Sequence, residues 1–196
     1  YDSAGIASVS KDGQKLSITK YASEKTTSDS IDRVAGGIAD HKGHSIGIAH
    51  TRWATHGGKT DANAHPHTDY KNRIAVVHNG TINNLDKGEN IKDAVSHALS
   101  LCDGSWGLAV IHKDSPKQVV VACNGSPMTI GLGRGKTFIA SETSAFSKYT
   151  KSFISMKDGE IGVIRASDSE GVDIGRIEQA PENDVLLTPA PSPHFT

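Results

Sequence analysis

The chain has 196 residues, a length that suits one domain with a substantial buried core. Its formal net charge is −1, and its lysines and arginines are scattered without a basic block, which argues against nucleic acid as a partner. No apolar run approaches the roughly 18–20 residues of a membrane-spanning helix, and the start is unlike a signal peptide, so we expect a cytoplasmic protein without a membrane partner. Cys102 and Cys123 lack metal or disulfide-framework spacing and are expected to be buried, reduced thiols.

The first half of the chain predicts a hairpin, a helix and two buried strands. Alternating residues at 4–10 and 15–19 flank a turn and indicate the hairpin. A helix is predicted over 28–39, because apolar residues recur there at spacings of three and four: Ile31, Val34, Ala35 and Ile38. The runs 46–50 and 73–78 are typical of buried strands.

The second half predicts one more long helix and a succession of short strands. The helix covers 91–101, with an apolar face formed by Ile91, Ala94, Val95, Ala98 and Leu101. Turn residues separate four strand-like runs, at 106–112, 118–123, 128–132 and 136–139, which indicates an antiparallel sheet. A short helix within 141–147, a hairpin formed by 153–156 and 160–165, and an extended tail from about 167 complete the prediction.

Polar motifs follow both buried strands of the first half, where side chains can converge on a cleft. His50–Gly57 comes directly after the first strand and His78–Gly80 ends the second. Arg52 has a planar guanidinium that matches a carboxylate with two hydrogen bonds, and Trp53 can form an apolar wall. Thr55 and His56 add short-range hydrogen-bonding groups. This set of residues suits an amino acid that is held by its own ends.

These motifs, together with Asn63–His67 and the runs Tyr1–Gly5, Gly125–Pro127 and Phe138–Ser141, are highly specific in this order. The chain resembles the glutaminase (class II glutamine amidotransferase) domain of the glutamine–fructose-6-phosphate aminotransferase family. The resemblance implies an α+β, N-terminal-nucleophile hydrolase sandwich, with two antiparallel sheets between helical layers. It also implies an enzyme that releases ammonia from the side chain of L-glutamine without a cofactor.

The resemblance assigns roles to individual positions. The side chain of Asn79 and the backbone N–H of Gly80 would form the oxyanion hole, and Arg52 would bind the α-carboxylate of glutamine. Trp53 would close over the substrate, although a core tryptophan is an alternative interpretation. Two further residues, Thr55 and His56, would bind the substrate or its covering loop. Supporting positions near the cleft are expected for His50, His65 and His78.

The resemblance further implies a two-part protein. Residues 1–180 would form the amidotransferase domain, and the proline-rich residues 181–196 would link it to a sugar-isomerase domain that makes glucosamine 6-phosphate from fructose 6-phosphate. The complete protein is expected to be a homo-oligomer. A different amidotransferase, such as amidophosphoribosyltransferase, remains an alternative.

The chain departs from the family pattern in two places. The family's nucleophile is an N-terminal cysteine, which would precede Tyr1, and neither Cys102 nor Cys123 lies in a matching context. Tyr1 therefore looks like a truncation point. A second family segment is missing between Asn84 and Leu85. These departures leave open a catalytically silent module that binds glutamine but does not hydrolyse it.

Histidine is concentrated in one part of the sequence, where seven of the ten histidines lie between His41 and His78. Their spacing does not match the usual zinc motifs, and an extended His65-Pro66-His67 segment would point its two rings in opposite directions. The sequence therefore predicts no metal site.

Overall fold

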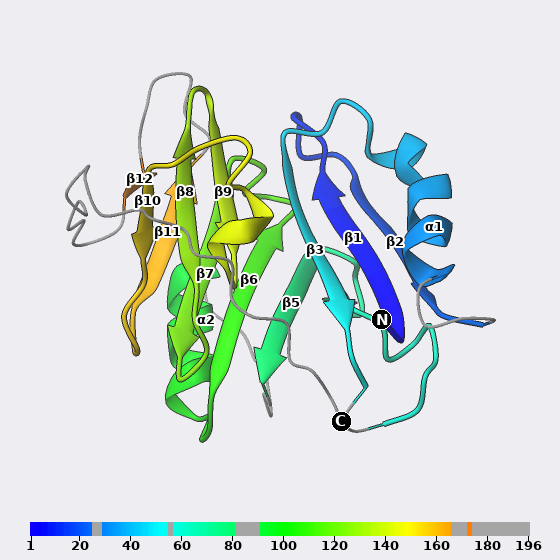
Figure 1. Cartoon of the computed structure of the whole chain (residues 1–196), viewed down its shortest axis with the longest axis horizontal. Coiled ribbons are helices and arrows are strands. Elements are labelled where there is room, and N and C mark those ends of the chain that lie inside the picture. Colours follow the sequence, from blue (N-terminus) through cyan, green and yellow to red (C-terminus); the bar gives the residue numbers. More distant parts are fainter. Residues whose placement is uncertain (25–28, 55–56, 81–90, 166–171, 174–196) are drawn as a thin grey trace.

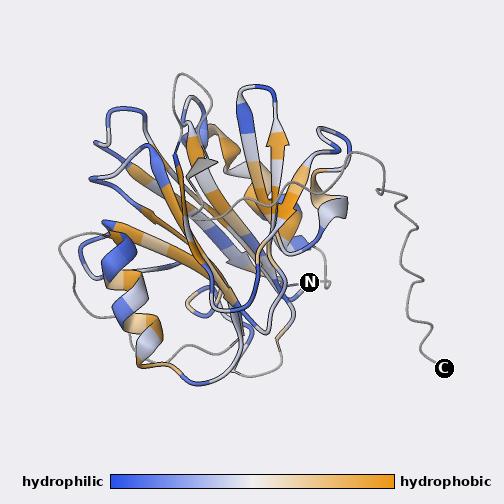
Figure 2. Cartoon of the chain, turned by 90° about the vertical axis from the view of Figure 1, so that its left-hand side faces the viewer, coloured by the Kyte–Doolittle hydropathy of each residue, from blue (hydrophilic) through white to orange (hydrophobic). Residues whose placement is uncertain are grey.

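The computed structural model describes residues 1–24, 29–54, 57–80, 91–165 and 172–173 of the chain. Antiparallel sheets face one another, and one α-helix lies on the outer side of each layer (Figure 1). Hydrophobic residues are concentrated on the strands and hydrophilic residues on the turns (Figure 2). The predicted α+β sandwich is confirmed. Among the described residues, no helix is long and apolar enough to cross a membrane.

The first sheet has three strands, in the order β2-β1-β3. Strand β1 (Ser3–Val9) is central and pairs antiparallel with β2 (Leu16–Ala22) and with β3 (Ile46–Arg52). The predicted hairpin is therefore confirmed. Strand β3 extends two residues further than predicted, so that Arg52 is the last residue of the strand and lies opposite Ser3.

The second sheet has six strands, in the order β12-β11-β7-β6-β5-β4, and all neighbours are antiparallel. Four of its strands begin and end within two residues of the predicted runs. Two very short strands form its edges. The bounds are β4 (His67–Thr68), β5 (Ile74–Gly80), β6 (Trp106–His112), β7 (Gln118–Asn124), β11 (Ile161–Arg165) and β12 (Val172–Asp173).

A third sheet places β8 (Thr129–Gly133) between β9 (Lys136–Ala140) and β10 (Phe153–Ser155). The predicted hairpin between 153–156 and 160–165 is wrong, because β10 pairs with β8 whereas β11 pairs with β7. The turn between them carries the chain from one sheet to the other. Backbone bonds fix this crossing, from Met156 N to Met128 O at 2.9 Å and from Gly159 N to Cys123 O at 2.8 Å.

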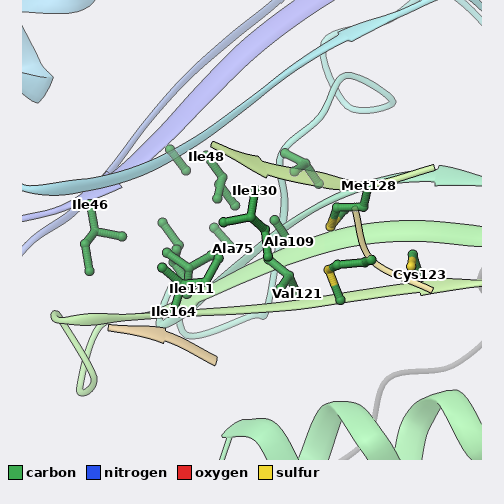
Figure 3. Packing of buried hydrophobic residues seen from close by; sticks show 14 of the residues in the cluster. Ile46, Ile48, Ala75, Ala109, Ile111, Val121, Cys123, Met128, Ile130 and Ile164 are labelled. Atoms are coloured by element: carbon green, nitrogen blue, oxygen red, sulfur yellow. The ribbon is translucent and has the colours of Figure 1, made fainter. Parts of the chain in front are cut away.

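The main core fills the space between the six-stranded sheet and both three-stranded sheets (Figure 3). Alternate residues of β5, β6 and β7 point into this space, because successive side chains of a strand point to opposite faces. Strands β1, β3, β8 and β10 supply the facing side chains. The fully or largely buried members include Ala7, Val9, Ile48, Ala75, Ile111, Val121, Ile130 and Ile154.

Helix α2 (Ile91–Ser100) covers the opposite face of the six-stranded sheet. Val95 and Leu99 pack there against the other set of alternate strand residues, among them Val110 and Val120. The predicted helix is confirmed, but its last turn differs. Leu101 lies beyond the helix and is 67% exposed, whereas Leu99 is buried.

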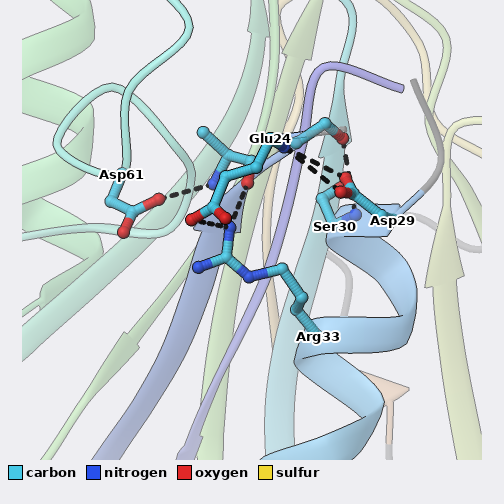
Figure 4. A network of polar contacts seen from close by, with 7 residues as sticks. Glu24, Asp29, Ser30, Arg33 and Asp61 are labelled. Carbon is cyan, nitrogen blue, oxygen red and sulfur yellow. Dashed lines mark hydrogen bonds and ion pairs between the residues drawn. The ribbon is translucent and has the colours of Figure 1, made fainter. Parts of the chain in front are cut away.

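Helix α1 (Asp29–Gly36), followed by the short 3₁₀ helix η1 (Ile38–His41), contacts β1 and β2. The helix is confirmed, but its apolar face does not form the contact, since Ile31 is 42% and Ile38 53% exposed. Instead Ser30 is buried, and Arg33 donates a 2.7 Å hydrogen bond to Ala22 O (Figure 4). Polar groups therefore attach α1 to the sheet.

Two further expectations concern short or terminal segments. The helix predicted within 141–147 is a single 3₁₀ turn, η2 (Thr143–Ala145), without a side-chain cap. The break between Asn84 and Leu85 and the proposed linker at 181–196 lie outside the described residues. Only Val172 and Asp173 of the expected tail are described, as strand β12.

Candidate functional site

A short chain of hydrogen bonds joins the three sheets at the end of β5. The Nε2 atom of His50, on β3, lies 2.8 Å from Oδ1 of Asn79 on β5. The Nδ2 group of Asn79 donates to the hydroxyl of Ser141, directly after β9, at 3.0 Å. With Oδ1 of Asn79 facing His50, and because an amide oxygen can only accept, His50 donates through Nε2 and the Asn79 amide is held between two partners.

In this orientation the Asn79 side chain keeps one N–H group available as a donor. An amide nitrogen has two N–H groups, and Ser141 accepts from one of them. The side chain of Asn79 is exposed, so its second N–H can reach a ligand. Gly80 is the last residue of β5 and pairs with Trp106. Asn79 and Gly80 thus occupy consecutive positions at the end of a strand.

Arg52 is the last residue of β3, and Trp53 follows it directly. Trp53 is 68% exposed, so the alternative interpretation as a core tryptophan is wrong. Its ring is available to cover a ligand. Burial is the main cause of the lowered pKa values of His50 and His65, and the positive charge of Arg52 contributes to both shifts, which indicates that Arg52 lies near these two histidines. Thr55 and His56 lie outside the described residues.

Asp2 holds the backbone after Arg52 in place. This carboxylate is buried; it accepts a 2.8 Å hydrogen bond from Ala54 N and forms a 2.5 Å ion pair with Lys59. The hydrogen bond from Lys59, followed by that from Ala54, lowers the pKa of Asp2. The start of β1 is therefore tied to the segment that carries Trp53.

Four histidine rings gather next to Asn79. The ring of His65 is central, with its centroid 4.4 Å from His50, 4.3 Å from His67 and 4.5 Å from His78. The expectation that His65 and His67 point in opposite directions is wrong. Of these two residues only His67 belongs to a strand, so strand alternation does not apply to this segment.

Three of these rings, those of His50, His65 and His67, favour the neutral form at neutral pH. Burial, reinforced by the neighbouring histidines and Arg52, lowers the pKa of His65 to about 2. Burial also lowers the pKa values of His50 and His67. Neutral His50 with its proton on Nε2 is the tautomer that the Asn79 contact requires.

Neither cysteine fits the role of a nucleophile. The thiol of Cys123 lies in the core and donates to Lys157 O at 3.2 Å, and burial followed by Asp158 and Glu160 raises its pKa to about 11. The thiol of Cys102 donates to Ala98 O at 3.2 Å. Thiolates are the reactive form, so the raised pKa of Cys123 suppresses its reactivity. The expected buried, reduced state is confirmed for Cys123, whereas Cys102 is half-buried.

Local sequence patterns did not assign a role to two residues that support the site. Ser141 and Asp2 are single polar residues at the ends of strands, and only the quoted family motifs pointed to them. A cavity of about 380 Å³ lies elsewhere, between β1 and η1, where the hydroxyl of Ser8 lies 2.6 Å from Nδ1 of both His41 and His44. None of the predicted site residues lines that cavity.

Solved structures identify the class of fold. Glutamine phosphoribosylpyrophosphate amidotransferase from B. subtilis superimposes with a TM-score of 0.65 over 91% of this chain and 44% of its own, at 19% identity. A predicted glutamine amidotransferase from Pseudomonas aeruginosa gives 0.51 over 84% of this chain and 85% of its own, at 12% identity. The fold is that of the N-terminal-nucleophile glutamine amidotransferases.

Sequence comparison then gives the family. The glutamine–fructose-6-phosphate aminotransferase of Thermococcus kodakarensis is 34% identical over 236 residues, which cover all of this chain and 38% of the relative. That of Tropheryma whipplei is 36% identical over 191 residues, or 77% of this chain and 29% of the relative. No family model matches. The sequence places this chain in the glutamine–fructose-6-phosphate aminotransferase family, as the motifs predict, and the chain spans about a third of its relatives' length.

Proposed function

We propose that this chain binds L-glutamine and forms the glutaminase part of a glutamine–fructose-6-phosphate aminotransferase. The observation that carries the proposal is the oriented amide of Asn79. His50 and Ser141 hold it so that an N–H, not the oxygen, faces outward beside Gly80. Such fixed donors stabilise the negative charge that develops on an amide oxygen when a nucleophile attacks its carbon.

In the proposed complex Arg52 binds the α-carboxylate of glutamine and Trp53 covers the substrate. Thr55 and His56 add contacts to the substrate or to its covering loop. A cysteine thiol attacks the side-chain carbonyl, the C–N bond breaks, and ammonia leaves. Water then hydrolyses the thioester to give glutamate. The residues described here contribute binding and oxyanion stabilisation, and the family's N-terminal cysteine supplies the nucleophile.

The released ammonia would serve a covalently linked sugar-isomerase domain that converts fructose 6-phosphate to glucosamine 6-phosphate. The relatives' greater length supports this arrangement, with residues 1–180 as the amidotransferase domain and 181–196 as the connection. The alignment with the Thermococcus protein is also longer than this chain, so that relative contains residues without a counterpart here. We place the protein in the cytoplasm, as a homo-oligomer.

A second candidate function is a binding module that holds glutamine without hydrolysing it. Such a module would keep the oriented amide of Asn79 and the guanidinium of Arg52 as binding groups. Covalent labelling with a glutamine-like electrophile separates the two functions. A glutaminase is modified at a terminal cysteine, whereas a silent module binds glutamine and stays unmodified.

Calorimetric titration with L-glutamine tests the proposed site. Loss of a charged hydrogen bond should make Arg52→Ala bind roughly tenfold or more weakly. Arg134→Ala, at an exposed turn, is the matched control and should bind like the wild type. Asn79→Ala should bind within a few fold of the wild type but release glutamate about 10²–10³-fold more slowly in the active protein. Equal binding by the two arginine variants, or no binding by the wild type, would overturn the proposal.

A further inference from the structure

Three histidines next to Asn79 form a group that the proposed reaction does not use as a set. His65 precedes β4, His67 lies in β4, and His78 lies in the neighbouring strand β5. One ring nitrogen of each lies within 4.8 Å of those of the other two. The polypeptide therefore gathers three good metal-ligand groups at one edge of the six-stranded sheet.

The separation of the nitrogens is close to that of a metal site. Around a tetrahedral zinc ion with Zn–N distances of 2.0–2.1 Å, two nitrogens lie about 3.3 Å apart. The three rings would need to approach one another by about 1.5 Å at most. His67 and His78 are half-buried, and β4 is a two-residue edge strand, so modest ring rotations can bring the nitrogens together.

His65 is buried and has a ring nitrogen without a hydrogen-bond partner among the described residues, as expected for a residue that binds a ligand. The residue is 6% exposed, and its Nδ1 atom is buried without a hydrogen-bond partner among the described residues. A buried nitrogen of this kind is costly unless another group satisfies the ring.

Nearby positive charges set a limit on the strength of the site. Lys20 and Arg52 both contribute to the lowered pKa of His67, so their charges reach this cluster and oppose a cation there. Lys20 donates to Ala64 O at 2.9 Å, immediately before His65 in the sequence. An anion that shares the ion's coordination sphere would reduce this repulsion.

We propose that His65, His67 and His78 bind one divalent transition-metal ion of the zinc class, with a fourth coordination position open to water or an anion. Three nitrogen ligands with one open position form an established type of zinc coordination. The sequence predicted no metal because none of its spacings is a known motif. The pairing of β4 with β5 creates this set instead, by bringing His78 beside His65 and His67.

Zinc binding by the full chain is measured by competition with a coloured chelator, independently of glutamine. We expect one equivalent to bind, and His67→Ala to weaken binding roughly tenfold or more. His97→Ala, on the exposed side of α2, is the matched control and should leave the affinity unchanged. Equal affinity of the wild type and His67→Ala, equal weakening in both variants, or no zinc binding by the wild type would overturn the proposal.

A second variant places the ion at residue 67 directly. His67→Cys keeps a ligand, so it should retain zinc and, with Co²⁺, show a thiolate-to-cobalt charge-transfer band that the wild type lacks. This readout also serves if His67→Ala fails to fold, which metal-free thermal unfolding would reveal. A His67→Cys variant that folds and binds Co²⁺ without this band would contradict the assignment.

Discussion

Gly5 allows the central strand β1 to lie directly beneath the backbone of His65. A Cβ atom on Gly5 would be 2.1 Å from His65 O and 2.6 Å from Lys20 Cβ. The first contact is with backbone, which cannot move aside as a flexible side chain can. The small residue at this position therefore sets how closely the histidine segment approaches the first sheet.

Gly5→Ala should lower the free energy of unfolding by about 3 kcal/mol, because the methyl group displaces either β1 or the His65 carbonyl. Urea denaturation at neutral pH measures this change. The control is Gly36→Ala at the end of α1, where a Cβ meets nothing within 4 Å and the helix should gain about 0.5–1 kcal/mol. Equal stability of the two variants would contradict the close approach at Gly5.

At the scale of the element, helix α1 is attached by its polar side. Arg33 lies 4.5 Å from the centroid of the Tyr21 ring, donates to Ala22 O, and forms a 2.9 Å ion pair with Glu24. These contacts reach from the middle of the helix to the last two residues of β2 and to Glu24 just beyond it. The apolar side, which includes Ile31, faces outward.

Arg33→Met should therefore cost about 1–2 kcal/mol of stability, from the lost hydrogen bond and cation–π contact. Ile31→Ser should change it by less than about 0.5 kcal/mol, because Ile31 is already exposed. Thermal unfolding of both variants under the same conditions measures the two changes in stability. A larger loss in Ile31→Ser would restore the orientation that the apolar spacing predicted.

The elements could be predicted where local sequence determines them. The run 106–112 became β6 with the same bounds, because a continuous apolar stretch ends at turn residues on both sides. The sequence of a turn such as Lys157–Gly159 is the same whether the next strand pairs with the preceding strand or joins another sheet. Likewise, apolar spacing identified α1 but not the side that contacts the sheet, since Arg33 found partners on distant residues.

The site was predictable to a similar extent. Arg52 and Asn79 stand in motifs specific enough to be recognised without coordinates. The partners of Asn79 could not be recognised in the same way, because His50 and Ser141 are 29 and 62 residues away from it in the sequence. Such contacts depend on how the sheets pack together, which local patterns do not determine.

At the scale of the whole molecule, buried neutral histidines make the fold sensitive to acid. The pKa of His65 falls from its ordinary 6.5 to about 2 on folding. As the pH drops below 6.5, the unfolded chain binds a proton that the folded chain does not, so the free energy of unfolding decreases. The lowered pKa values of His41, His50 and His67 act in the same direction.

We expect the free energy of unfolding to fall between pH 7.5 and pH 5, with His65 alone contributing about 2 kcal/mol. Urea denaturation at several pH values measures the slope. This window lies above the range where carboxylates such as Asp2 titrate, so histidines dominate it. His65→Gln should reduce the slope and His97→Ala should not. A stability that does not change over this window would contradict the neutral cluster.

The hydrogen-bonded chain His50–Asn79–Ser141 links the first two sheets, through His50 and Asn79, to the end of the third, where Ser141 directly follows β9. Separation of any one sheet from the others would break it, even if every strand stayed paired with its neighbours. Ligand affinity at Asn79 is therefore thermodynamically linked to the docking of all three sheets. A ligand present at a hundred times its dissociation constant would stabilise the docked state by about 2.7 kcal/mol. Substitutions deep in the third sheet, far from Asn79, can thus weaken binding without touching the ligand.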